Sequence, residues 1–245
     1  MTLIPESAPI TGSKGNCLLR VQLRQFFDEY TKLQRQPKIV IMIGFPGDKA
    51  GLTNGKLQRK ADQVWNEFAG NPIYENFYLH YFHHPLLLVY AGTPSPFSDG
   101  LPPWADSKFT VRYMTGFVSQ QPSLLAPGSV SRYGYWSWED RGIPTVAAYR
   151  GNAEAINIVA AWRGDSANNV PAEGRRNGQT FSNGWARARK VGPHFALAGS
   201  FNEWSNPTEE PNAEISKDIE PSHVFGMKYL DLLKKEAAAF KAGVP

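Results

Sequence analysis

Short apolar runs recur along this chain, and each is followed by glycine, polar or aromatic residues. The run at 38–44 reads Lys-Ile-Val-Ile-Met-Ile-Gly, with no alternation of apolar and polar residues. Strands that are apolar on both faces are typical of parallel sheets covered by helices. We expect strands at 38–44, 86–90, 109–117, 133–140, 156–162 and 195–201.

Helical patterns separate several of these strands. Apolar residues recur at helical spacing in 18–33, 55–68 and 222–241. Strands that alternate with helices or long loops indicate a (β/α) architecture. A complete barrel needs eight strands, and this chain opens on a helix rather than a strand. We therefore expect an α/β fold, a TIM-type (β/α) barrel lacking its first one or two βα units, as one domain over 1–245 with an irregular lead-in at 1–16.

Composition excludes several classes of function. The formal net charge is +4 and no run of five basic residues occurs, which argues against a nucleic-acid partner. The single cysteine, Cys17, excludes intramolecular disulfides and a cysteine-based zinc cluster. Neither His-x-His nor His-Glu-x-x-His spacing occurs, so we expect no metal and no other cofactor. No apolar run reaches the length of a membrane span, and we expect no membrane partner.

The tetrapeptide Phe-Asn-Glu-Trp at 201–204 follows the apolar run at 195–199. The carboxyl ends of parallel strands are where α/β enzymes carry out chemistry. Glu203 offers a carboxyl group that can handle a proton, Trp204 a flat face for a sugar ring, and Asn202 an amide for a sugar hydroxyl. These residue types predict a carbohydrate-active enzyme. The alternatives are a surface carboxylate, an amide that fixes the loop and a tryptophan that only packs.

A second acidic segment contains Trp136, Trp138, Glu139 and Asp140. Strand alternation would send Trp136, Trp138 and Asp140 to one face and Glu139 to the other, so only one carboxylate should point inward. Glycosidases usually pair two carboxyl groups. We therefore expect Glu203 to act with Glu139 or Asp140, and the two tryptophans to support sugar rings. The sequence leaves open whether the reaction retains or inverts the anomeric configuration.

Two arginines are further candidates for binding substrate. Arg112 lies within the apolar strand expected at 109–117, where a buried charge needs a partner such as a carboxylate. Arg163 follows the strand expected at 156–162. We expect both guanidinium groups to hold hydroxyls or carboxylates. His83 and His84 precede a strand, at the end where catalysis is uncommon, and are set aside.

Several motifs together resemble the carboxyl-terminal half of the glycoside hydrolase family 99-like barrels, over about 133–233. They are Gly-Arg-Arg-Asn-Gly-Gln-Thr-Phe from Gly174, Trp185, the segment 195–204, Asp-Ile-Glu-Pro-Ser from Asp218, and Phe-Gly-x-x-Tyr-Leu from Phe225. The resemblance implies a (β/α)₈ barrel that cleaves α-mannosidic bonds with retention. It also suggests a secreted or periplasmic location, although the residues themselves leave the compartment unknown.

The family motif is Asn-Glu-Trp-x-Glu, in which two carboxylates three residues apart do the work. Glu203 matches the first carboxylate, but Asn206 stands at the second, and an amide cannot donate and recover a proton. Either another carboxylate substitutes, or the chemistry differs, or glycans are bound without cleavage. The substitutes on this chain are Glu139, Asp140, Glu209 and Glu210. We expect a glycoside hydrolase acting on a polysaccharide or glycan; the alternatives are a non-catalytic glycan-binding barrel and a fragment of a larger carbohydrate-active enzyme.

Overall fold

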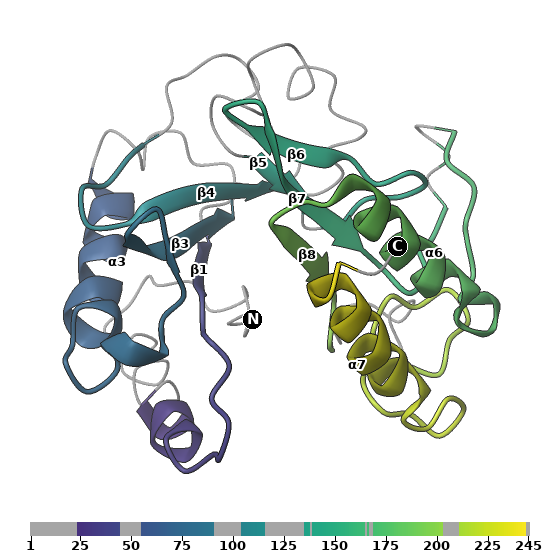
Figure 1. Ribbon diagram of the computed structural model, residues 1–245, viewed down its shortest axis with the longest axis horizontal. Helices are drawn as coiled ribbons and strands as arrows, with labels where there is room; N and C mark the ends of the chain where they lie inside the picture. Colours follow the sequence, from purple (N-terminus) through teal and green to yellow (C-terminus); the bar gives the residue numbers. More distant parts are fainter. Residues whose placement is uncertain are drawn as a thin grey trace. The chain divides into compact units, whose positions relative to one another are not determined.

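The computed structural model describes residues 24–44, 55–90, 104–115, 135–137, 139–164, 166, 169–202 and 211–243. Contacts divide the chain into two compact units. The first comprises Met1–Gly92 and Pro102–Tyr113, and the second comprises Thr93–Leu101 and Met114–Pro245. Both units combine strands with helices, which confirms the α/β class (Figure 1). The expectation of a single domain stays a prediction.

The first unit is built around the strands β1 (Ile41–Gly44), β2 (His80–Tyr81), β3 (His84–Tyr90) and β4 (Thr110–Thr115). β3 lies between β1 and β4. β1 runs parallel to β3, whereas β2 forms an antiparallel hairpin with it. The four residues from Leu86 to Val89 are at most 1% exposed, because β3 is central and covered on both faces. The apolar run therefore forms the kind of strand that its composition predicts.

Helices cover this sheet. α3 (Lys56–Val64) buries Leu57, Ala61 and Val64 and continues into the π-helix η1 (Trp65–Ala69). The Nζ atom of Lys60 donates to the carbonyl oxygen of Gly44 at 2.7 Å, which ties the helix to the end of β1. Residues 24–30 are helical, and a 3₁₀ helix, η2 (Glu75–Phe77), follows η1. Ring contacts between the helix at 24–30 and the segment around η2 complete this part of the core.

The second unit contains β5 (Tyr135–Ser137), β6 (Val146–Tyr149), β7 (Asn152–Ile158) and β8 (Phe195–Ala198). β6 and β7 form an antiparallel hairpin, whose turn residues Arg150 and Gly151 have φ values of 51° and 82°. β7 and β8 are parallel, with Ile156 opposite Ala196 and Ile158 opposite Ala198. β5 follows β4 in the strand order, and the last two residues of β4 belong to this unit.

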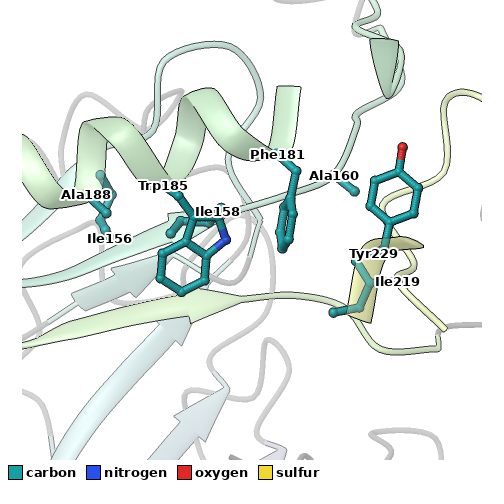
Figure 2. Packing of buried hydrophobic residues seen from close by; sticks show 8 residues of the cluster. All are labelled: Ile156, Ile158, Ala160, Phe181, Trp185, Ala188, Ile219 and Tyr229. Atoms are coloured by element: carbon teal, nitrogen blue, oxygen red, sulfur yellow. The ribbon is translucent and has the colours of Figure 1, made fainter. Parts of the chain in front are cut away.

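The helices α6 (Gln179–Val191) and α7 (Lys228–Lys241) cover β7 and β8, and the short 3₁₀ helix η5 (Arg176–Gly178) precedes α6. Figure 2 shows Phe181 and Trp185 extending from α6 beside Ile158 of β7, with Tyr229 of α7 at the same core. Phe181 and Ile158 are each fully buried. This core fixes the strands whose carboxyl ends carry the candidate site.

Several expected elements differ from the observed ones. β5 ends at Ser137, and β7 begins at Asn152 rather than at residue 156. The carboxyl-terminal helix begins at Lys228 rather than near residue 222. The sequence analysis missed β6 and α6, because Val-Ala-Ala-Tyr is a weak strand signal and the α6 sequence carries glycine and many polar residues. The described strands form two sheets, and neither closes on itself.

Candidate functional site

Asn157 of β7 brings together two segments that the sequence analysis singled out. Its side chain is 2% exposed, and its Nδ2 atom donates to the carbonyl oxygen of Leu197 in β8 at 3.1 Å. Its Oδ1 atom accepts a hydrogen bond from the backbone nitrogen of Asp140 at 3.0 Å. One amide side chain therefore links the acidic segment after β5 to the carboxyl end of β8.

Glu139 lies in a buried ion pair. Its side chain is 10% exposed, and its Oε2 atom accepts from Nζ of Lys217 at 2.5 Å. The Nε atom of Arg141 lies 3.7 Å from Glu139 Oε1. Lys217 and Arg141 are themselves 5% exposed in their side chains. Charges removed from water in this way persist only where the pairing geometry is good, so the carboxylate of Glu139 is firmly held.

Asp140 is fully buried, and its Oδ2 atom accepts from the backbone nitrogen of Thr145 at 2.8 Å. Glu139 is also buried. The expectation that only one of these two carboxylates points inward was wrong. The alternation of a strand does not apply to Glu139 and Asp140, because β5 ends at Ser137. Asp140 is held instead by hydrogen bonds with Asn157 and Thr145.

The carboxyl end of β8 is joined to the segment 218–220. The hydroxyl of Ser200 donates to Oδ1 of Asp218, and both residues are buried. The backbone nitrogen of Ile219 donates to the carbonyl oxygen of Ser200 at 3.1 Å, and that of Glu220 donates to Phe201 at 2.9 Å. The path of the chain just before the Asn-Glu-Trp motif is therefore fixed by three hydrogen bonds.

The chain reaches the surface directly after this point. Phe201 is 52% exposed, and Asn202 is exposed as well. An exposed amide at the carboxyl end of β8 can reach a ligand, as the sequence analysis expected of Asn202. Glu203 and Trp204 lie outside the described residues, as does Trp138. Their roles stay predictions.

We refer to six residues as the buried polar cluster: Glu139, Asp140, Asn157, Ser200, Lys217 and Asp218. They come from the chain after β5, from β7, from the end of β8 and from the segment before α7. Through Asn157 and Ser200 the cluster is hydrogen-bonded to the end of β8 and can orient the residues that emerge there. Lys217 was missed because a single lysine in a polar loop carries no sequence pattern, whereas Asp218 belongs to one of the quoted motifs.

Trp136 belongs to the core of the second unit. Its ring is 1% exposed and lies 5.0 Å from the ring of Phe195. Its Nε1 atom donates to Oε2 of Glu154 at 2.9 Å. An indole buried on both faces cannot stack on a sugar, so the interpretation of Trp136 as a sugar platform is corrected to core packing.

The two candidate arginines have different surroundings. Arg163 is exposed and can contact a ligand. Arg112 is 4% exposed and belongs to the first unit, where its Nη1 atom donates to the carbonyl oxygen of Val111 at 2.8 Å. Its guanidinium carbon lies 5.5 Å from the ring centre of Tyr81 and 5.7 Å from that of Phe82. Aromatic faces thus provide part of the environment that the sequence analysis expected from a carboxylate.

No family model and no curated protein sequence matches this chain. Among solved structures, the GH99 endo-α-mannosidase from Bacteroides thetaiotaomicron matches with a TM-score of 0.57 and 12% identity, covering 98% of this chain and 74% of that one. The same enzyme in complex with bis-tris-propane matches with the same score and identity, covering 78% of its chain. The chain is similar in fold to GH99 endo-α-mannosidases. The resemblance inferred from the motifs is thereby confirmed at the level of fold.

Arg175, in the GH99-like motif that begins at Gly174, binds the backbone of the segment that carries Lys217 and Asp218 of the buried polar cluster. Arg175 is 1% exposed, and its guanidinium donates to three backbone carbonyls, those of Pro211, Ala213 and Asp218, at 3.3, 3.1 and 2.5 Å. The guanidinium also lies 4.3 Å from the ring centre of Tyr229. Burial lowers the pKa of Arg175, while the neighbouring Tyr229 opposes that shift. This part of the motif therefore holds the segment that carries Lys217 and Asp218.

The described residues contain no group of three or more histidine, cysteine, aspartate or glutamate side chains that could hold a metal ion. Within the same residues, no helix is long and apolar enough to cross a membrane.

Proposed function

We propose that this chain is a glycoside hydrolase that acts on a glycan or polysaccharide, built on a TIM-type (β/α) barrel. The observation that carries the proposal is the similarity in fold to GH99 endo-α-mannosidases over 98% of the chain. The Asn-Glu-Trp sequence of the family motif begins at Asn202, four residues after the last residue of β8. A carboxylate at this position of a (β/α) fold lies where such enzymes carry their catalytic groups.

We assign Glu203 as one catalytic carboxylate and Glu139 or Asp140 as its partner. One carboxyl group would protonate the glycosidic oxygen as the bond to the anomeric carbon breaks. The other would form a bond to that carbon or activate the water that attacks it. Asn157 hydrogen-bonds both to Asp140 and to Leu197 of β8, so the segment of Glu139 and Asp140 lies beside the end of β8, which supports this pairing. Asp140 is fully buried, and Glu139, with 10% of its side chain exposed, is the more accessible of the two.

The proposed sugar contacts are made by groups at strand ends. Asn202 and Arg163 are exposed and can donate to hydroxyls or carboxylates of the substrate. Trp204 and Trp138 would provide flat apolar faces for sugar rings. The role of Arg112 in binding substrate stays a prediction from the sequence, and its guanidinium is buried beside Tyr81 and Phe82 of the first unit.

The test is a reducing-end release assay on a broad polysaccharide panel that includes α-mannans. Purified wild-type protein is compared with Glu203→Gln, and with Glu75→Gln as a control on the exposed helix η2. We expect Glu203→Gln to lose activity on the order of 10²–10⁴-fold, as removal of a proton-transferring group does. Glu75→Gln should retain it. A fully active Glu203→Gln variant would overturn the assignment.

Asn206 favours a second candidate function, a non-catalytic glycan-binding barrel, because the second carboxylate of the family motif is replaced by an amide. In that case no substrate in the panel is cleaved by folded protein. Affinity electrophoresis in polysaccharide gels would then show retarded migration of the wild-type protein. Trp204→Ala should reduce that retardation, and Glu75→Gln should not.

A further inference from the structure

Two neighbouring residues of the buried polar cluster, Lys217 and Asp218, contact different segments of the proposed active site. We propose that the Lys217-Asp218 dipeptide acts as a positioning clamp that sets the spacing between the carboxylates after β5 and the catalytic segment after β8. This inference rests on the proposed function for its catalytic consequence. Its structural content can be tested separately.

The first arm of the clamp is the ion pair between Lys217 and Glu139. The Nζ–Oε2 distance is 2.5 Å, and the two side chains are 5% and 10% exposed. A buried ammonium group that faces a buried carboxylate loses part of the compensation for its desolvation if the pair separates. The ion pair therefore opposes movement of the segment containing Glu139 and Asp140 relative to Lys217.

The second arm is formed by Asp218 and the end of β8. Asp218 is fully buried and accepts the hydroxyl hydrogen bond of Ser200, three residues before Glu203. The backbone bonds from Ile219 to Ser200 and from Glu220 to Phe201 extend the same contact by two residues. These bonds fix the backbone after β8 as far as Phe201, the residue before Asn202.

The clamp is itself held in place. Adjacent Cα atoms are about 3.8 Å apart, so the two arms start from a fixed separation. The hydroxyl of Ser216 accepts from the backbone nitrogen of Asp218 at 3.2 Å, and Arg175 binds the carbonyl of Asp218 at 2.5 Å. The distance between two glycosidase carboxyl groups decides the course of the reaction, and a displacement of about 1 Å can reduce the rate about 10²-fold. A clamp on both segments would thus act on kcat.

The experiment compares Lys217→Met and Ser200→Ala with matched controls in the same unit. Arg189→Met breaks the ion pair between α6 and α7, in which Arg189 Nη1 lies 2.5 Å from Glu236 Oε2. Thr180→Val removes a buried hydroxyl that donates to Gly174 at 2.6 Å. We expect the two clamp variants to lower kcat at least about tenfold with KM changed less than about twofold, because ground-state binding is untouched. Lys217→Arg should restore most of kcat.

The controls should lose thermal stability to a similar degree but keep kcat within about twofold of wild type. Unchanged kcat in both Lys217→Met and Ser200→Ala would overturn the clamp. If Lys217→Met does not fold, Ser200→Ala decides the question alone, since it removes only a hydroxyl group.

Should the wild-type protein cleave nothing, the proposed function fails while the clamp remains testable by amide hydrogen exchange. Ser200→Ala should raise the exchange rates of the Ile219 and Glu220 amides at least about tenfold, because local opening becomes easier. Thr180→Val should leave these two amides unchanged. Equal exchange in Ser200→Ala and wild type would overturn the clamp without reference to activity.

Discussion

At the scale of single residues, Arg175 shows how one side chain can hold a loop in place. Its guanidinium binds the carbonyls of Pro211, Ala213 and Asp218 and lies against the rings of Phe225 and Tyr229. A planar fork can make these contacts together, whereas an ammonium group cannot. The segment 211–218 therefore depends on an arginine at this position.

We predict that Arg175→Lys lowers the free energy of unfolding by about 2–3 kcal/mol, because carbonyls are left unpaired and the ring contacts are lost. Urea denaturation followed by tryptophan fluorescence measures the change. The neighbouring Arg176 provides the control, since its side chain is 53% exposed in its ion pair with Glu173. Arg176→Lys should change stability by less than about 0.5 kcal/mol, and equal effects at both positions would contradict the interpretation.

The sequence predicted the acidic segment after β5 as part of the candidate site, and the structure links that segment to the end of β8 through Asn157. The sequence could not predict the ion pair of Glu139 with Lys217, which joins residues 78 positions apart. The sequence analysis also predicted that Trp136 binds a sugar, whereas in the structure Trp136 packs against Phe195 and donates a hydrogen bond to Glu154. Tryptophan content near a strand end does not distinguish a ring that faces the core from one that faces solvent.

At the scale of elements, α6 approaches β7 closely because Gly184 carries no side chain. A Cβ atom at this position would lie 2.9 Å from the Cγ2 atom of Ile158, which is fully buried. The glycine that weakens the helical pattern in the sequence is thus the residue that lets the helix pack. Its cost in helix propensity is about 1 kcal/mol relative to alanine.

We predict that Gly184→Ala destabilises the protein by about 1–3 kcal/mol, because overpacking outweighs the gain in propensity. Combination with Ile158→Leu, which removes the Cγ2 branch, should cost less than the sum of the two single changes. Thermal and urea unfolding of the single and double variants measure the difference. A stabilised Gly184→Ala protein would show that α6 can move away from β7 without cost.

Where apolar runs were continuous, the sequence predicted one boundary of each strand: the ends of β1 and β3 and the start of β8. The predictions failed where pairing partners decide the structure. β7 starts at Asn152 because β6 pairs with it from the other side of a two-residue turn, and this contact is invisible in an apolar pattern. α6 was missed because its sequence contains Gly184, a residue that disfavours helix. The glycine is needed there because α6 packs closely against β7.

At the scale of the whole molecule, buried tyrosines occur in both units. Burial raises the pKa of Tyr30 and Tyr78 in the first unit and of Tyr229 in the second. Tyr78 is 1% exposed, and its hydroxyl has no hydrogen-bond partner among the described residues. Below pH 10 both the folded and unfolded forms are protonated. Above about pH 10 the unfolded phenol ionises first, so the folded state loses stability as pH rises.

We predict that the free energy of unfolding falls between pH 9 and pH 11, and that Tyr78→Phe reduces this fall by up to about 1.4 kcal/mol per pH unit above 10. At pH 7 the same variant should be as stable as wild type or slightly more so, since it removes an unpaired hydroxyl. Urea titrations at each pH measure both effects. Tyr74→Phe, at a half-buried position, is the control, and an identical pH dependence in wild type and Tyr78→Phe would contradict the prediction.

The α/β class and the likeness to GH99 enzymes were accessible from the sequence, because both rest on local runs and short motifs. Whether the strands close into a barrel could not be predicted from the sequence, because closure depends on which strands pair. β2 and β6 form hairpins that a strict alternation of strands and helices does not contain.

The polar side chain inside β7 has a consequence for how this chain folds. Ile156 and Ile158 face α6, while Asn157 between them bonds the chain on both sides. A strand of interchangeable apolar residues could pair one residue out of step at little cost, and every side chain would then change faces. Such a slip here would turn the Asn157 amide toward Trp185 and Phe181 and leave it without partners. Asn157 therefore favours the observed register of β7, because its two hydrogen bonds, to Leu197 of β8 and to Asp140 after β5, can form together only in that register.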